Sequence, residues 1–190
     1  RENYKLGVSQ SNHFISISGS QDNGTSIKKQ DGWIEFYGAD GMEGVIHPLN
    51  DDWMIGSVQY GGRIRTKDGG KTSGGVSPSG QSGSGNAAWE APLVYDPNNQ
   101  MRIFHFNDSV FVSEDFGTSW SYRGVPSSIS NNIKQAAIAE NNTDIIVVSS
   151  GEKIDKSIDG GATFNSIKNN LPYASIQDIA FDNEIPILKT

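Results

Sequence analysis

The chain has 190 residues, and its content of 35% hydrophobic and 9% aromatic residues is enough for one domain with a packed core. Fifteen Lys and Arg against 22 Asp and Glu give a net charge of -7, so we expect no nucleic-acid partner. The absence of cysteine excludes disulfides and thiol nucleophiles, and no apolar run approaches the roughly 20 residues that cross a bilayer, so we expect no membrane insertion.

Short strands joined by tight turns are indicated along the whole chain. It contains 22 glycines together with many Asn and Ser, and strand-like runs such as "NDSVFVSED". No segment shows a convincing amphipathic helix longer than two turns, so the sequence predicts an all-β fold. The chain starts at "RENYK", with neither an initiating Met nor a signal peptide, and we expect a fragment of a longer protein.

The first stretch, 1–27, is interpreted as the end of an earlier repeat unit. Its "SQDNGTSI" lines up with "VQYGGRIR" further along the chain and places Gln21 opposite Gln59. The next unit, 28–73, ends in the eight residues "TKDGGKTS". A Ser- and Gly-rich stretch at 74–86 breaks the spacing after this unit, and its composition is that of a flexible loop.

The eight-residue segment at the end of 28–73 occurs three times. The copies are "TKDGGKTS" at 66–73, "SEDFGTSW" at 113–120 and "SIDGGATF" at 157–164. Repeat periods of roughly 40 to 50 residues are typical of propeller blades. In each unit, three strand-like runs precede the repeated segment, which acts as a hairpin into a fourth strand. We therefore predict a partial β-propeller of four-stranded antiparallel blades, with the following units: 28–73, 87–123, 124–168 and the start of a further blade at 169–190.

The repeated segment has the chemistry of a tight hairpin. An Asp carboxylate can accept hydrogen bonds from backbone N–H groups just ahead of it, and the Gly two places on supplies a positive φ angle at little steric cost. The terminal aromatic is expected to pack between neighbouring sheets. We interpret these residues as structural rather than catalytic, because one reaction rarely needs the same acid three times: Asp68, Gly70, Asp115, Gly117, Trp120, Asp159, Gly161 and Phe164.

The three segments resemble the Asp-box, or bacterial neuraminidase repeat. This repeat is shared by sialidases, by the ten-bladed domain of sortilin-type proteins and by the seven-bladed xyloglucanase-type glycoside hydrolases. The strings "SGSQDNGT", "YGADGMEGVIHP" and "AAWEAPLVYDPNNQ" are also similar to large secreted Bacteroidetes-type surface proteins with sortilin-like repeats. The resemblance covers nearly the whole chain. It implies a propeller fold and a bacterial secreted or cell-surface location, with the boxes on the outer rim, away from the ligand-binding face.

No residue is assigned to catalysis, although two carboxylates are considered. Asp40 and Glu43 lie in the Gly-rich string "GADGME", and glycoside hydrolysis generally needs two carboxyl groups. The string departs from the Asp-Val/Ile-Gly-Gly pattern that the xyloglucanase-type families carry, and no arginine stands in a setting diagnostic of sialidases. The alternative interpretation of both residues is hydrogen bonding in a turn.

Ligand binding is assigned to a different set of residues. Tyr60 is the main candidate, because the turn that follows it, Gly61-Gly62, leaves little to bury its ring. Gln59 and Asp22 complete the candidate set. The three histidines are isolated from one another, so we expect no metal and no cofactor.

Two function classes follow from the sequence. The first is a non-catalytic propeller segment of a large secreted or cell-surface bacterial protein, for adhesion, scaffolding or glycan binding. The alternative is part of a sialidase-like or xyloglucanase-like glycoside hydrolase whose catalytic residues lie mostly outside this chain. The expected partners are the remainder of the same longer chain or a partner that completes the propeller, and a glycan or a surface protein.

Overall fold

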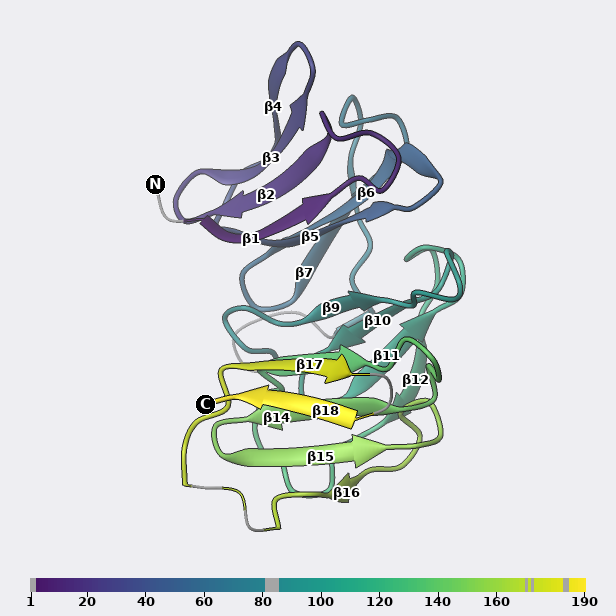
Figure 1. Cartoon of the computed structure of the whole chain (residues 1–190). Coiled ribbons are helices and arrows are strands. Elements are labelled where there is room, and N and C mark those ends of the chain that lie inside the picture. The colour runs from purple at the N-terminus through teal and green to yellow at the C-terminus, as the bar shows by residue number, and fades with distance from the viewer. Residues whose placement is uncertain (1–2, 81–85, 170, 172, 183–184) are drawn as a thin grey trace.

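The computed structural model describes residues 3–80, 86–169, 171, 173–182 and 185–190, and over these residues it contains strands and turns and no helix. The strands form five antiparallel sheets that follow one another along the chain, from purple to yellow in Figure 1. The first sheet contains β1 (Asn3–Val8), β2 (Ser16–Ser20), β3 (Gly24–Lys29) and β4 (Gly32–Tyr37). The second contains β5 (Gly41–His47), β6 (Asn50–Val58), β7 (Gly62–Thr66) and β8 (Gly74–Gly75).

The later sheets repeat this plan. The third sheet contains β9 (Leu93–Tyr95), β10 (Ile103–Phe106), β11 (Val110–Ser113) and β12 (Ser121–Gly124). The fourth contains β13 (Gln135–Ile138), β14 (Ile146–Ser150), β15 (Lys153–Ser157) and β16 (Asn165–Ser166). The fifth has two strands, β17 (Asp178–Asp182) and β18 (Ile185–Lys189).

Within each sheet the strands are paired in chain order, as in a meander. The first strands of successive sheets lie against one another, β1 against β5, β5 against β9, β9 against β13 and β13 against β17, so they surround a common axis. This is the arrangement of propeller blades. The predicted all-β class and the partial β-propeller of four-stranded antiparallel blades are confirmed.

The structure corrects the predicted limits of the first two units. The boundary between 27 and 28 falls inside β3, and β4 belongs to the first sheet, so residues 3–37 form a complete four-stranded blade. The reason is the hairpin between β3 and β4, a tight turn that lacks the Ser/Thr pattern of the repeated segment. The predicted loop 74–86 also begins with β8, which pairs with Ile64 and Arg65; residues 81–85 of it lie outside the described residues.

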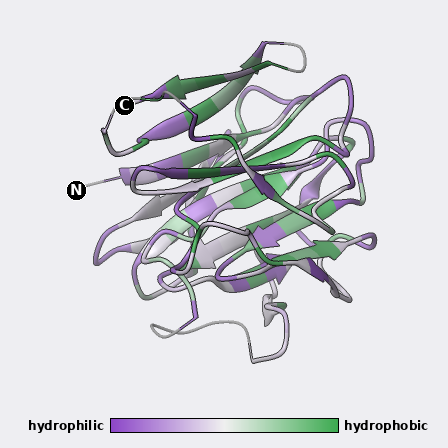
Figure 2. Ribbon diagram, turned by 90° about the horizontal axis from the view of Figure 1, so that it is seen from below, coloured by the Kyte–Doolittle hydropathy of each residue, from purple (hydrophilic) through white to green (hydrophobic). Residues whose placement is uncertain are grey.

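Four apolar clusters fill the spaces between neighbouring sheets. Ile17 and Ile27 pack with Met54 between the first and second sheets, and Ile55 packs with Ile103 between the second and third. The next two spaces are filled in the same way, by a cluster that includes Phe106 and Phe164 and by one that includes Val147 and Ile179. Figure 2 shows the apolar segments as green stretches of the stacked strands. Burial of alternate side chains on both faces of a sheet therefore holds the blades together.

The meander gives the stack two different ends. Turns from the third to the fourth strand, where the repeated segments lie, are at one end, which we call the box end. Turns from the second to the third strand and the connections between sheets are at the other, which we call the loop end. The repeated segments themselves are called box turns 66–73, 113–120 and 157–164.

Candidate functional site

The carboxylate of Asp115 is bound entirely within its own box turn. Its Oδ1 accepts hydrogen bonds from the Ser113 hydroxyl at 2.8 Å, from the Thr118 N–H at 2.9 Å and from the Ser119 N–H at 2.8 Å. Its Oδ2 accepts from the Ser119 hydroxyl at 2.7 Å. The Ser113 hydroxyl also accepts from the Gly117 N–H at 2.7 Å, so one serine and one aspartate organise the whole turn.

The other two box turns repeat these contacts. Asp68 accepts from the N–H and hydroxyl of Thr72 at 2.9 and 2.6 Å, and Asp159 accepts from those of Thr163 at 2.8 and 2.6 Å. These donors, followed by the hydroxyl of Thr66 or Ser157, lower the pKa of each carboxyl to about 2. The three aspartates lie on three different sheets, so they do not converge on one site.

For Asp115, burial is the largest single influence on the pKa of the carboxyl. It raises the pKa of Asp115, but the hydrogen bonds from Ser119, Ser113 and Thr118 outweigh it and lower the pKa to about 2. A carboxyl with such a low pKa is ionised at neutral pH and cannot donate the proton that a general acid supplies. The chemistry of the box turns is therefore that of backbone capping.

Basic side chains of the preceding sheet hold two of the box turns in place. Arg65 on β7 donates to the Phe116 carbonyl at 2.8 Å and to the Thr118 hydroxyl at 2.7 Å. Arg123 on β12 donates to the carbonyls of Gly160 and Asp159, both at 3.0 Å. Each contact joins one sheet to the next. Sequence reasoning missed these pairs, because the separation in sequence between the arginine and the turn differs from one sheet to another.

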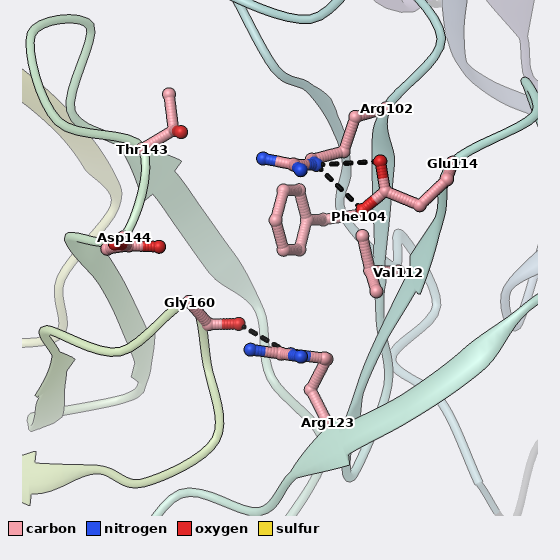
Figure 3. A pocket seen from close by; sticks show the side chains of 8 residues that line it. All are labelled: Arg102, Phe104, Val112, Glu114, Arg123, Thr143, Asp144 and Gly160. Carbon is pink, nitrogen blue, oxygen red and sulfur yellow. Dashed lines mark hydrogen bonds and ion pairs between the residues drawn. The ribbon is translucent and has the colours of Figure 1, made fainter.

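A small hollow of about 90 Å³ lies beside the third box turn (Figure 3). Arg102 faces it with its guanidinium paired to Glu114 at 2.8 Å and to the buried carboxylate of Asp96 at 3.2 Å. On the opposite side, Arg123 is bound to the Gly160 carbonyl, as the dashed line shows. Both guanidinium groups are thus used within the fold, and the hollow has no free cationic group aimed at a substrate.

At the loop end, the predicted residues Asp22, Asp40 and Gln59 form one chain of hydrogen bonds between the first two sheets. The Asp40 carboxylate accepts from the Asp22 N–H at 2.8 Å, and the Asp40 N–H donates to Gln59 Oε1 at 3.2 Å. Asp22 has a φ of 56° and is held in this unusual backbone conformation by the contact. Asp40 therefore fixes two neighbouring turns.

Glu43 lies close to the axis, where it connects three sheets. Its Oε2 accepts from the Leu93 N–H at 2.8 Å, and its Oε1 lies 3.5 Å from the ammonium nitrogen of Lys5. The same ammonium lies 3.6 Å from Glu90 Oε1. Burial lowers the pKa of Lys5, but the two carboxylates outweigh it, and the net result is a raised pKa. Lys5 and the two glutamates form an inter-sheet ion cluster.

A buried arginine lies between the second and third sheets. Arg63 is 1% exposed, and it donates to His105 Nδ1 at 3.1 Å and to the carbonyls of Ala91 and Pro92 at 2.8 Å. Burial lowers the pKa of Arg63 to about 10, and the charge of nearby Glu43 partly offsets this effect. These bonds anchor the segment that leads into β9.

Tyr60 and Trp89 form the wall of an open hollow at the loop end. Their ring centroids are 5.1 Å apart at an interplanar angle of 89°, and the Tyr60 N–H donates to the Trp89 carbonyl at 3.0 Å. Tyr60 has a φ of 58°, a strained conformation for a non-glycine residue. The hollow has a volume of about 560 Å³. It is completed by the connection into the fourth sheet and that sheet's β14–β15 turn, with Asn131, Asn132, Lys134, Ser150 and Gly151, and by Ala87 and Ala88 ahead of β9.

The sequence pointed to Tyr60 but not to its partner. Trp89, which the sequence did not single out, is 39% exposed. Its indole N–H donates to the Tyr4 hydroxyl at 3.2 Å, and that hydroxyl donates to Gln21 Oε1 at 3.2 Å. The Trp89 ring is therefore fixed from two sides before any ligand arrives.

In the part of the chain that the structure describes, no group of three or more His, Asp or Glu side chains is arranged to bind a metal ion. These same residues also include no helix with the length and apolar character needed to cross a membrane.

Comparison with known proteins shows the fold. No protein-family model matches the chain, and no curated protein sequence matches it. Among solved structures, the chain is similar to a GH74 enzyme of Niastella koreensis, with a TM-score of 0.67 and 18% identity over 94% of this chain and 31% of that chain. It is similar to the GH74 xyloglucanase of Xanthomonas campestris, with a TM-score of 0.67 and 12% identity over 90% of this chain and 31% of that chain.

A third similarity is to YCF48 of Cyanidioschyzon merolae, with a TM-score of 0.63 and 13% identity over 95% of this chain and 60% of that chain. The chain thus spans about a third of the length of the GH74 enzymes and less than two thirds of YCF48. All of these are β-propeller folds with four-stranded antiparallel blades. At such low identity the likeness establishes the architecture of the chain.

Proposed function

We propose that the chain is a non-catalytic segment of a larger β-propeller protein and that it binds a carbohydrate in the hollow beside Tyr60 and Trp89. The observation that carries the proposal is the pair of aromatic rings, 5.1 Å apart and edge to face, at the loop end. Ligand pockets are typically apolar with a few convergent polar groups, and an aromatic face can cover the C–H face of a sugar ring. The amides of Asn131 and Asn132, with the ammonium of Lys134, supply hydrogen-bonding groups for hydroxyls.

Two further observations favour a sugar ligand in a secreted or cell-surface bacterial protein. The chain is similar in structure to GH74 enzymes, one of which is named as a xyloglucanase. The box turns resemble the Asp-box repeat that sialidases and sortilin-type proteins share, and this resemblance implies a secreted or cell-surface location. The rest of the propeller comes from the same longer chain or from a partner.

We infer that the chain does not hydrolyse the sugar, because both candidate carboxylates already accept hydrogen bonds within the fold. Asp40 and Glu43 each hold a backbone N–H of another sheet, at 2.8 Å in both cases. Neither lines the Tyr60–Trp89 hollow. A general acid in a glycoside hydrolase has to reach the glycosidic oxygen of a bound sugar.

The binding experiment uses titration calorimetry with neutral oligosaccharides, including xyloglucan heptasaccharide and cellohexaose, on the chain and on two variants. We expect Tyr60→Ala and Trp89→Ala each to weaken binding about tenfold or more, since loss of a buried aromatic contact at a binding hot spot costs about 2 kcal/mol. Tyr173→Ala is the matched control, because its ring is 90% exposed and lies outside the hollow. Equal affinity of all four proteins would contradict the proposal.

A second function, as part of a glycoside hydrolase, is favoured by one specific observation. Glu43 and Glu90 both lie within 3.6 Å of Lys5 Nζ, so their carboxylates are close enough together for the separations of about 5 to 10 Å found in glycosidases. Reducing-sugar release from xyloglucan, lost in Glu43→Gln or in Asp40→Asn, would support this function. Absence of release from the intact chain would support the non-catalytic proposal.

A further inference from the structure

The hollow beside Tyr60 and Trp89 is built by the middle sheets of the chain. Tyr60 belongs to the β6–β7 turn and Trp89 to the connection into β9, and the remaining wall comes from the connection into β13 and the β14–β15 turn. The first and fifth sheets lie on either side of these elements along the chain. The walls of the hollow therefore come from the interior of the sheet series, and not from the faces at its two ends.

The charge of this hollow differs from that of the chain. Among the described residues that line it, Lys134 alone carries a charge, and the others are aromatic, small or uncharged and polar. The whole chain has 22 Asp and Glu against 15 Lys and Arg. An acidic protein therefore has a hollow in which the described lining charge is positive.

Lys134 has a fixed backbone and an exposed side chain. Its N–H donates to the Ser149 carbonyl at 2.8 Å, directly ahead of β13. Within the part of the chain that the structure describes, no carboxylate forms an ion pair with its ammonium. A second ammonium, that of Lys153, lies 3.4 Å from the Ser130 hydroxyl, next to Asn131 of the hollow. Two lysines thus place positive charge on the same side of the hollow.

The acidic residues next in sequence to the lining residues are neutralised by other lysines. Glu90, which follows Trp89, has its carboxylate 3.6 Å from the Lys5 ammonium. Glu152 is paired with Lys168 at 2.6 Å. Both carboxylates are therefore compensated within the fold, and they oppose the charge of the hollow less than free carboxylates would.

Two aspartates on nearby elements are also bound within the fold. Asp155 on β15 is fully buried and accepts hydrogen bonds from the N–H and the hydroxyl of Ser128 at 2.7 and 2.5 Å. Asp108, in the β10–β11 turn, accepts from the Ser109 hydroxyl at 2.8 Å. Neither aspartate lines the hollow. The charge that a bound ligand contacts there is that of Lys134.

An ammonium beside an aromatic wall suits a sugar ring that carries negative charge. We propose that the hollow selects anionic sugar units, with Tyr60 and Trp89 against the ring and Lys134 paired with a carboxylate or a sulfate group on it. A lysine ammonium is a compact point charge without the planar fork of an arginine, so it can pair with either anion. This selectivity rests on the proposed function, since it concerns the carbohydrate bound at the same site.

The test compares hexagalacturonate with its fully methyl-esterified form by titration calorimetry at low salt. The two sugars have the same rings and differ in charge. We expect hexagalacturonate to bind about three- to fivefold more tightly, as for a partly exposed ion pair, and the difference to disappear in about 0.5 M NaCl. A sulfated carrageenan hexasaccharide and its desulfated form, measured in the same way, show whether the sulfate or the carboxylate is favoured.

Variants assign the selectivity to one ammonium. Lys134→Gln should bind the charged and the uncharged form of each sugar with equal affinity, and Lys134→Glu should prefer the uncharged form. Lys71→Gln is the matched control, because it removes the same unit of charge from an exposed lysine of box turn 66–73, at the other end of the stack.

The outcomes distinguish this selectivity from the proposed function. A preference for a charged sugar that is lost in Lys134→Gln and kept in Lys71→Gln supports it. Equal affinity of the unchanged chain for the charged and uncharged forms of both sugars, or a preference that Lys134→Gln leaves in place, overturns the selectivity alone, provided that Trp89→Ala still weakens binding. Binding that Trp89→Ala leaves unchanged, or no binding of any of these sugars, overturns both.

Discussion

The first sheet and the three sheets that follow it have the same strand order but differ in how the last hairpin is made. In the first sheet, β3 and β4 are joined by a tight turn around Gln30 and Asp31, and β4 has six paired or bulged residues. In the next three sheets a box turn takes this place, and the outer strands are short: β8 and β16 have two residues each and β12 has four. In each box turn, backbone N–H groups donate to one Asp carboxylate and to one Ser/Thr hydroxyl. These hydrogen bonds take the place of the strand-to-strand hydrogen bonds that a longer outer strand would make.

The faces of the same sheets differ as well. Apolar clusters fill the spaces between the described sheets, with buried Arg63 and His105 as polar exceptions. On the side of β2 that faces away from the second sheet, here called the serine face, the side chains are Ser16, Ser18 and Ser20. Strand order alone thus does not determine what a blade packs against. The alternation of side chains along the second strand determines it.

The strongest test of this contrast replaces two adjacent residues of β2, one at a time, with alanine. We expect Ile17→Ala to lower the free energy of unfolding by about 2 to 5 kcal/mol, because Ile17 is fully buried against Gly44 and the second sheet. Ser18→Ala, one residue away and on the serine face, should change it by less than about 1 kcal/mol. Urea unfolding followed by tryptophan fluorescence measures both. Similar losses for the two variants would mean that the serine face is packed as tightly as the opposite face.

The second test compares the two kinds of hairpin. Asp115→Ala should lower the free energy of unfolding by about 1 to 2 kcal/mol, because the N–H groups of Thr118 and Ser119 lose their acceptor. Asp31→Ala, in the exposed turn of the first sheet, should cost less than about 0.5 kcal/mol. The same urea experiment applies. An Asp31 variant as unstable as the Asp115 variant would refute the distinction between the hairpins.

The third and smallest effect is a dependence of stability on acid pH that comes from the aspartates of the box turns. The pKa of Asp115 is about 2 in the folded chain and 3.8 as its ordinary value, so the folded state binds fewer protons at intermediate pH. The contribution to stability is complete above about pH 4 and is lost as the pH falls toward 2. We expect the melting temperature of Asp115→Asn to fall less steeply over this range than that of the unchanged chain. Parallel curves for the two proteins would contradict this.

The sequence was sufficient for the repeated units and insufficient for the first one. Asp68, Asp115 and Asp159 could be aligned because each box turn uses side chains close in sequence, at fixed offsets. The first sheet was divided at the wrong place because a tight hairpin needs no such side chains. Side-chain hydrogen bonds within a turn produce a recognisable sequence pattern. A blade whose hairpin lacks them can be identified only from the pairing of its strands.

The candidate site was only partly predictable for a related reason. Tyr60 stood out because of the glycines after it, but its partner Trp89 comes from the connection into the third sheet. Glu43 was considered for catalysis, and its partners Lys5 and Leu93 belong to two other sheets. Contacts between sheets depend on how β1, β5 and β9 are placed around the axis, and sequence spacing does not report that placement.

The arginine contacts of the box turns have a consequence for how the chain unfolds. Arg65 belongs to the second sheet and its acceptors to the third, and Arg123 belongs to the third sheet and its acceptors to the fourth. Melting of one blade therefore deprives the hairpin of the next blade of its donor. In a linear array with such nearest-neighbour coupling, the second, third and fourth blades should lose their protection from hydrogen exchange as one cooperative block.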